Sequence, residues 1–497
     1  MILFYLTSAV FLGWSLGANH AANEFGTAVA TRMVKFRTAA TICAVFVVLG
    51  AVLSGAGTSA TLGTLGAVNA LGGSFMVALA AGLSVFWMTK IGLPVSVSQA
   101  VVGGIIGWNL FTGSQTDVSS LIAIVSTWIV CPVLAGGIAA LLFAGTRRYL
   151  AGHEVHILER DVTVRAGFLV MGAFGAYALG ANNVANVVGM FVPAVPAGST
   201  RLFGLVPFSS AQGLFLVGGV AIALGVATYS RRVMMTVGKE LFKLSPVTGL
   251  IVVAAQAAVL FLFASEPLRD WLVTHNLPPI PLVPVSSSQA VIGAVVGIAL
   301  AKGGRNIRYG VLARITGAWA ATPLIAGAVS FFGLFFLQNV FTLTVSRPIP
   351  YEITRPAFER VVSQGVPADK LEALAGARFR NAREFKAALR DTPGLAPADV
   401  RLTLAAAELR RYEIDPAKIV RLDLELLTPR QIEAIRSLAW TSYDHTWQLR
   451  DALVRESSQW AFLPETRRNY IHNRDLETRL RYLEAAFRVN GAEASPE

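Results

Sequence analysis

Long apolar segments fill the first 340 residues of the chain, and a polar, charged region follows them. The apolar segments run at roughly 2–31, 38–55, 75–89, 94–110 and 118–145, and again at roughly 166–195, 213–230, 244–265, 284–301 and 309–336. Several of them approach the roughly 20 residues that a helix needs to cross a bilayer. The pattern predicts an all-α integral membrane protein with about 10–12 membrane segments.

Two polar motifs recur at matched places in the two halves of this apolar region. Gly-Ala-Asn-x-x-x-Asn occurs at 17–23 and 180–186, and Pro-Val-Ser-x-Ser-Gln occurs at 94–99 and 284–289. In the same way, Trp128 with Pro132 is matched by Trp319 with Pro323, at displacements of 163, 190 and 191 residues for the three pairs. The chain is therefore an internal duplication, with about 27 extra residues in the second copy.

The basic residues indicate how the two copies are oriented. An odd number of crossings in each half would invert the second copy relative to the first. If the N-terminus is outside, most basic residues near the segment ends lie inside, Arg32, Lys90 and Arg147 among them, and only Arg201 and Arg269 lie outside. This positive-inside bias favours an inverted-topology repeat, an architecture common among secondary transporters.

The predicted units follow from this topology. We expect a membrane repeat at 1–145, a cytoplasmic linker at 146–165 and a second membrane repeat at 166–340, with re-entrant hairpins at the Pro94 and Pro284 segments. Residues 345–497 have helical periodicity and many charges, which predicts a soluble helical C-terminal domain. Counting crossings places this tail outside, and both a regulatory role and a plain solvated surface stay open for it.

Composition narrows the class of protein. With 54% hydrophobic and 14% charged residues and a mean hydropathy of +0.57, the chain does not fit a soluble enzyme. The net charge of +12 lies largely in short loops that orient membrane spans, so nucleic-acid binding is not expected. Cys43 and Cys131 have no ligand spacing around them, which indicates neither a disulfide nor a zinc site. We expect a multi-pass protein of a bacterial-type inner membrane, with the lipid bilayer as its surroundings.

The paired motifs and the inverted duplication resemble the inorganic phosphate transporter (PiT) family of cation-coupled symporters, over residues 1 to about 340. In that family the fourth position of the Gly-Ala-Asn motif is usually Asp in both halves, and the serine segment usually ends in His. Here these positions hold His20 and Asn183, and Gln99 and Gln289. The chain is thus similar to a divergent member, and the departure puts the family's sodium site in doubt.

The serine segments suit a small tetrahedral oxyanion. Proline is well placed to open a helix, and a helix N-terminus presents free N–H groups and a positive dipole end. Two such ends facing each other would hold an anion at the midplane. Close packing would explain Gly103 and Gly293, but it does not require matched hydroxyls. The expected substrate-binding residues are Ser96, Ser98, Gln99, Ser286, Ser287, Ser288 and Gln289.

Uptake of a divalent anion against about 100 mV costs roughly 4.6 kcal/mol, so a cation should travel with it. The resemblance implies sodium, which the amide oxygens of Asn19, Asn23, Asn182 and Asn186 could still bind, with Asn183 beside them. Alternatively, His20 and Glu24, four residues apart on one helix face, could carry a proton. Proton coupling, sodium coupling and no coupling are all open at this stage.

The substrate is less defined than the class of transporter. Hydrogen phosphate carries a proton that needs an acceptor, whereas sulfate needs only donors, so the loss of both Asp residues raises the case for sulfate. The resemblance places phosphate first and sulfate second. An anion channel and a membrane enzyme, for which Ser98, His20 and Glu24 would be the candidate trio, are remote alternatives. No cofactor is expected, and a homodimer is an open alternative for the assembly.

Overall fold

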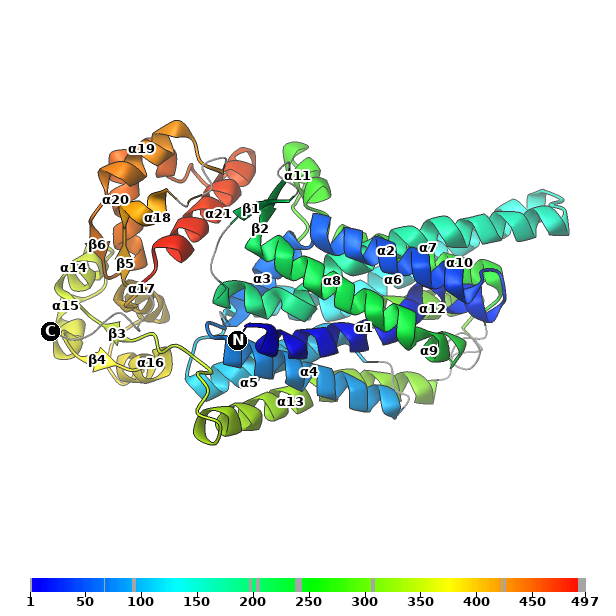
Figure 1. Ribbon diagram of the computed structural model, residues 1–497, viewed down its shortest axis with the longest axis horizontal. Helices are drawn as coiled ribbons and strands as arrows, with labels where there is room; N and C mark the ends of the chain where they lie inside the picture. Colours follow the sequence, from blue (N-terminus) through cyan, green and yellow to red (C-terminus); the bar gives the residue numbers. More distant parts are fainter. Residues whose placement is uncertain are drawn as a thin grey trace.

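A long helical bundle forms the first part of the protein and a smaller, mainly helical part follows it (Figure 1). The computed structural model describes residues 2–66, 68–91, 95–195, 199–202, 206–236, 244–304, 309–420, 422 and 426–489. Pro94 lies outside these described residues. The bundle contains α1 Ile2–Ala30, α2 Phe36–Ser54, α3 Ala56–Gly66, α4 Leu71–Lys90, α5 Val97–Thr112, α6 Val118–Gly152, α7 Ile157–Val188, η1 Gly189–Ala194, α8 Ser210–Thr228, α9 Ser230–Thr236, α10 Pro246–Leu262, α11 Glu266–Thr274, α12 Ser287–Ala301 and α13 Tyr309–Asn339. Strands β1 Ser199–Leu202 and β2 Val206–Ser209 pair antiparallel between η1 and α8.

Length and composition identify the helices that can cross a membrane. Seven helices of the described part are long and apolar enough, or eight spans if α10 and α11, which meet at a 67° bend, count as one. The shorter apolar helices α5 and α12 bring the membrane segments to ten. The expected all-α membrane fold is confirmed. The segments predicted to be re-entrant contain the short helices α5 and α12, whereas the bend lies between α10 and α11.

The two repeats are inverted and packed into each other. In Figure 1, α1 runs from the side of the smaller part toward the far end of the bundle, and α7 runs back from that end. A Cβ atom at Gly103 of α5 would lie 2.1 Å from the carbonyl oxygen of Pro323 in α13, and one at Gly293 of α12 would lie 2.1 Å from that of Pro132 in α6. The helix of one repeat therefore packs backbone to backbone on a helix of the other, and glycine permits this approach.

The irregular connection between the two repeats is shorter than the predicted linker 146–165. α6 ends at Gly152 and α7 begins at Ile157, so most of the region 146–165 is helical and only a short turn is left. Arg147 and Arg148 extend α6 beyond its apolar part, because arginine has a high helix propensity and its charged group can lie in water. This helical hairpin projects from the end of the bundle opposite the smaller part (Figure 1).

The C-terminal part, called the tail below, is itself duplicated. Tyr-Glu-Ile occurs at 351–353 and again at 412–414. Each copy begins the same order of strand, two α-helices, strand and two α-helices, with the 3-10 helices left aside. The strand pairs are β3–β4 and β5–β6, both antiparallel, and each half has its own apolar core. The elements are β3 Tyr351–Glu352, α14 Arg355–Ser363, α15 Ala368–Leu371, η3 Glu372–Leu374, β4 Arg378–Phe379, α16 Ala382–Arg390 and α17 Pro397–Ala407, then β5 Tyr412–Glu413, α18 Pro416–Ile419, α19 Pro429–Ser437, β6 Ser442–Tyr443, α20 Thr446–Glu456, η5 Ser458–Trp460, η6 Arg467–Asn469 and α21 Tyr470–Phe487.

The tail lies against the end of the bundle where α1 begins (Figure 1). Arg383 donates to the carbonyl oxygen of Leu110 at the end of α5 (2.8 Å), and Arg474 forms an ion pair with Asp270 of α11 (2.5 Å). The irregular segment that connects α13 to the tail packs with the bundle as well: Val345 is buried, and its carbonyl oxygen accepts from the indole N–H of Trp108 (2.9 Å). The bundle therefore includes chain beyond the end of α13.

Candidate functional site

The serine segments begin two helices in the interior of the bundle. Ser96 and Ser286 are the N-caps of α5 and α12, with nearly equal backbone angles (φ −96°, ψ 116° and φ −90°, ψ 113°). Each hydroxyl oxygen accepts from the N–H of the glutamine three residues later, Gln99 or Gln289, at 3.3 Å. The first serine of each segment thus ends its extended chain and starts its helix. The remaining first-turn N–H groups have no acceptor within their helix, so each end favours an anion.

Asparagines of the Gly-Ala-Asn motifs reach these serines across the repeats. Asn186 of α7 donates to the hydroxyl of Ser98 on α5 at 2.9 Å, and Asn23 of α1 donates to the hydroxyl of Ser287 on α12 at 2.9 Å. Ser98 in turn donates to the carbonyl oxygen of Val285, just before α12, at 3.3 Å. All four motifs therefore meet in the interior of the bundle.

Not every amide of the motifs is equally available for a ligand. The side-chain oxygen of Asn182 accepts from the N–H of Val285 (3.0 Å), and its amide nitrogen donates to the carbonyl oxygen of Val283 (3.3 Å). Asn182 thus pairs with the extended chain that leads into α12. Asn19 is half-buried and donates to Thr89 of α4 at 3.3 Å. These two amides position the backbone and α4, whereas Asn23 and Asn186 contact the serines.

Several buried polar atoms at this junction have no protein partner among the described residues. They are the side-chain oxygens of Gln99, Gln289 and Asn186 and the amide nitrogen of Asn183. An unsatisfied buried group costs about 1–3 kcal/mol, and such groups call for a functional explanation when they gather in one place. Because a side-chain amide can present either its oxygen or its NH₂ group, this set can donate to an anion or accept its proton. Ser288 is buried in the first turn of α12, beside them.

His20 and Glu24 are both buried in α1, but each has another partner. The His20 Nδ1 lies 3.2 Å from the carbonyl oxygen of Leu16, one turn earlier in the same helix. The Glu24 Oε1 accepts from the amide of Gln256 on α10 at 2.5 Å. Gln256 was not predicted as a site residue. Its signal was available, since it is the one amide side chain in the apolar sequence of α10.

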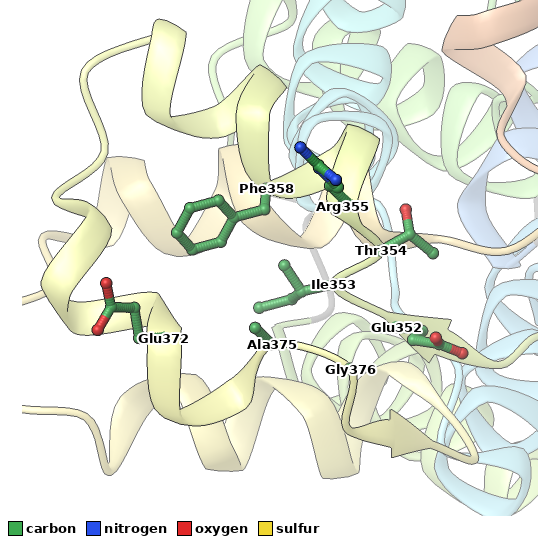
Figure 2. Close-up of a pocket in the computed structure, with 8 residues that line it drawn as sticks. All are labelled: Glu352, Ile353, Thr354, Arg355, Phe358, Glu372, Ala375 and Gly376. Atoms are coloured by element: carbon green, nitrogen blue, oxygen red, sulfur yellow. The ribbon is translucent and has the colours of Figure 1, made fainter.

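The tail has a surface pocket, which we compared with the buried junction as a place for a ligand. It is lined by Glu352, Ile353, Thr354, Arg355, Phe358, Glu372, Ala375 and Gly376 (Figure 2). Ile353 and Phe358 face each other across it, while the charged groups of Glu372, Arg355 and Glu352 lie apart around them. Because these charges do not converge, the pocket does not rival the buried junction of the four motifs.

Known proteins are similar to this chain in sequence and in fold. The model of the phosphate transporter family matches residues 16–330 and 271–396, so the likeness extends beyond residue 340, where it was expected to end. A putative phosphate permease of Pyrococcus horikoshii is 26% identical over 405 residues, covering 66% of this chain and 96% of the relative. The sulfate permease CysP of Bacillus subtilis is 29% identical over 342 residues, covering 67% and 86%.

A solved structure, entitled the sodium-dependent phosphate transporter, has the same fold. Its TM-score is 0.55 at 21% identity, over 68% of this chain and 98% of that chain. The family match spans more than half of the chain and includes both copies of each motif. This finding excludes the membrane-enzyme alternative. The chain belongs to the phosphate transporter (PiT) family of multi-pass membrane transporters.

Proposed function

We propose that this protein is a cation-coupled symporter of a small tetrahedral oxyanion, with inorganic phosphate as the first candidate substrate. The observation that supports it best is the crossed pair of contacts, Asn186 to Ser98 and Asn23 to Ser287, at the interior ends of α5 and α12. Two helix N-termini, hydroxyls and amides supply many donors in a region shielded from water, which is the chemistry that a tetrahedral oxyanion requires.

The buried amide side chains at the junction can accommodate the proton of hydrogen phosphate. Hydrogen phosphate has a P–OH group, and Gln99, Gln289 and Asn186 each present a buried oxygen that can accept its proton. With their NH₂ groups turned to the ligand, the same amides would donate to sulfate. Sulfate is the second candidate because a sulfate permease is among the relatives.

The proposed orientation has the N-terminus and the tail outside and the α6–α7 hairpin inside. It is supported by the basic residues near the hairpin end, including Arg32, Arg147 and Arg148. The proposed units are two membrane repeats, at 1–145 and 166–340, joined by the cytoplasmic region 146–165 and followed by the tail. A homodimer is an expectation that light scattering of the purified protein tests.

Purified protein in proteoliposomes tests the function. Labelled phosphate and labelled sulfate are offered under separately imposed proton and sodium gradients. We expect saturable phosphate uptake that requires one of the two gradients, with weaker uptake of sulfate. Uptake that is linear in concentration and independent of both gradients would instead indicate a channel.

A further inference from the structure

The first half of the tail holds the C-terminal end of α5. Arg383 of α16 donates from its side chain to the carbonyl oxygen of Leu110 (2.8 Å) and from its backbone N–H to that of Gly113 (3.2 Å). The last carbonyl groups of a helix have no partner within it, and the helix dipole favours a cation there. We call this contact the first grip. Because Ser96 caps the other end of α5, a single helix connects the first grip to one half of the anion site.

The second half of the tail holds the other repeat. Arg474 of α21 pairs with Asp270 of α11 (2.5 Å), and Arg467 donates to the carbonyl oxygen of Asn276, two residues beyond the end of that helix (2.5 Å). We call these contacts the second grip. The non-helical segment that follows leads to Ser286, the N-cap of α12. The second grip therefore holds the chain that enters the other half of the anion site.

The two halves of the tail are joined to each other by buried polar contacts. The ring of His445 is buried, with one nitrogen 2.8 Å from the hydroxyl of Thr354 and the other 2.9 Å from the carbonyl oxygen of Glu408. Arg360 and Asp451 add an ion pair at 2.5 Å. Through its two grips, the joined tail bridges the two membrane repeats at one end of the bundle (Figure 1).

Such a bridge opposes the motion that transport requires. A transporter built from inverted repeats exposes its site to one side at a time, by moving one part of the protein against the other. The serine segments are buried in this structure. Opening the end of the bundle that the tail covers would separate elements that the two grips hold at a fixed distance, so one grip must break first.

The second grip is the weaker of the two. Beside the first grip, Val345 and Arg347 hold the start of the tail to the bundle, through hydrogen bonds with Trp108 and Asn69. The ion pair of the second grip joins side chains that are 28% and 25% exposed, and salt in the solvent weakens a pair of this kind.

We propose that the tail is a clamp that slows transport: with both grips formed it holds this end of the bundle closed, and the second grip releases when the end opens. The inference rests on the proposed transport, but it does not depend on which anion or which coupling cation is carried. In the proposed orientation the clamped end is the outer one. The ionic strength of the outer solution would then set the transport rate.

A variant without the second grip tests the clamp. Phosphate uptake into proteoliposomes is measured at fixed sodium concentration and pH, with choline chloride on both sides raised from about 0.1 M to about 1 M, which shortens the Debye length from roughly 10 Å to 3 Å. Wild type should become about two- to fivefold faster, the size expected when a partly exposed ion pair is lost. Arg467→Ala/Arg474→Ala should be that fast already at low salt and change little.

The control removes the same charge from the tail without touching either grip. Arg401→Ala/Arg468→Ala replaces two exposed arginines, and it should follow wild type at both salt concentrations. A grip variant that is as slow as wild type at low salt would overturn the clamp.

A cross-link tests the same contact in the opposite direction. In Asp270→Cys/Arg474→Cys, a flexible thiol reagent that a reductant can cleave should lower uptake to less than about a tenth, because the repeats can no longer separate at this end. Reduction should restore the rate, and each single-cysteine variant should keep its rate after the same treatment. The native Cys43 and Cys131 are buried away from the reagent. Full uptake by the cross-linked protein would overturn the clamp.

Hydrogen exchange of α11 in detergent solution requires no transport and also shows whether the variants are folded. In wild type it should speed up with salt, whereas in Arg467→Ala/Arg474→Ala it should be fast at both concentrations. If α11 responds in this way but wild type transports neither phosphate nor sulfate, the proposed function is wrong and the grip stands. If wild type transports phosphate while α11 ignores both the salt and the substitutions, the clamp alone is wrong.

Discussion

Asn186 of α7 donates to the hydroxyl of Ser98 on α5 at 2.9 Å, which joins the second copy of one motif to the first copy of the other. The reciprocal contact, Asn23 to Ser287, is shifted by one position, because the counterpart of Ser98 in the second repeat is Ser288. The two halves of the site are therefore related but not equal. Neither repeat can complete the site alone, since each supplies the partner of the other.

The Asn186–Ser98 contact should appear as an energetic coupling. Asn186→Ala and Ser98→Ala should each weaken phosphate binding by about 1–3 kcal/mol, roughly 5- to 150-fold. Because the residues are in direct contact, the double variant should deviate from additivity by about 0.5–3 kcal/mol. Equilibrium dialysis of labelled phosphate against the four purified proteins measures this cycle. Strict additivity would show that the two groups act independently.

The meeting of the four motifs could be predicted from the sequence, because polar residues inside apolar segments must find partners within the protein. The helix starts were predicted too early: proline was expected to open each helix, but Pro284 lies in the extended chain two residues before the N-cap Ser286, and α12 begins at Ser287. The partner of Glu24 could not be predicted. Its four-residue spacing from His20 suggested a pair within α1, whereas Gln256 is 232 residues away and is brought close only by the packing of α10.

Packing of the repeats depends on glycines at backbone contacts. Gly297→Ala should destabilise the protein by about 1–3 kcal/mol, because its Cβ atom would lie 2.1 Å from the carbonyl oxygen of Gly136, which belongs to the backbone of α6 and cannot move aside alone. Gly137→Ala is the matched control, since a Cβ atom there meets nothing within 4 Å. Thermal unfolding in detergent should show a lower midpoint for the first variant only. Equal midpoints would contradict the close packing of α6 on α12.

The contacts of residues 345–347 with the bundle predict at which residue the chain can be cut to remove the tail. A chain that ends after Arg347 should stay folded and transport phosphate, because it keeps Val345 against Trp108 and the paired hydrogen bonds between Asn69 and Arg347. A chain that ends after Gln338 loses these contacts and should unfold at a lower temperature. Size-exclusion profiles after heating, followed by uptake assays, compare the two. A folded longer chain without uptake would show that the tail takes part in transport.

Acid should loosen the second half of the tail. Burial would raise the pKa of Glu477, but hydrogen bonds and charge from Arg450 and Arg481 outweigh it and hold the pKa below its ordinary value of 4.5. The ionised group therefore stabilises the tail above that pH, and this stability is lost as the pH falls through the lowered pKa. Hydrogen exchange of α20 and α21, corrected for intrinsic rates, should speed up in this range. Glu477→Gln should show a smaller change, and an equal change would assign the effect to other carboxyl groups.

The duplication of the tail was not predicted, and the reason is physical. Its halves share little more than Tyr-Glu-Ile and an order of short elements, and different apolar residues fill the two cores. In the bundle, by contrast, the repeated glycines make matching backbone approaches and the repeated serines make matching helix caps in both halves, so their identities are retained. Specific contacts of this kind keep the same residue types at matched positions of the sequence. Apolar packing in a core accepts many different residues and leaves no such match.

Equilibrium binding of labelled phosphate to the purified Ser98→Ala/Ser287→Ala variant tests the anion site most directly. We predict affinity at least about tenfold weaker than wild type, because two buried hydroxyls that can turn their O–H groups toward a charged ligand are lost. Ser126→Ala, which removes an exposed hydroxyl from α6, should bind as wild type does. Wild-type affinity in a folded Ser98→Ala/Ser287→Ala protein would contradict the site.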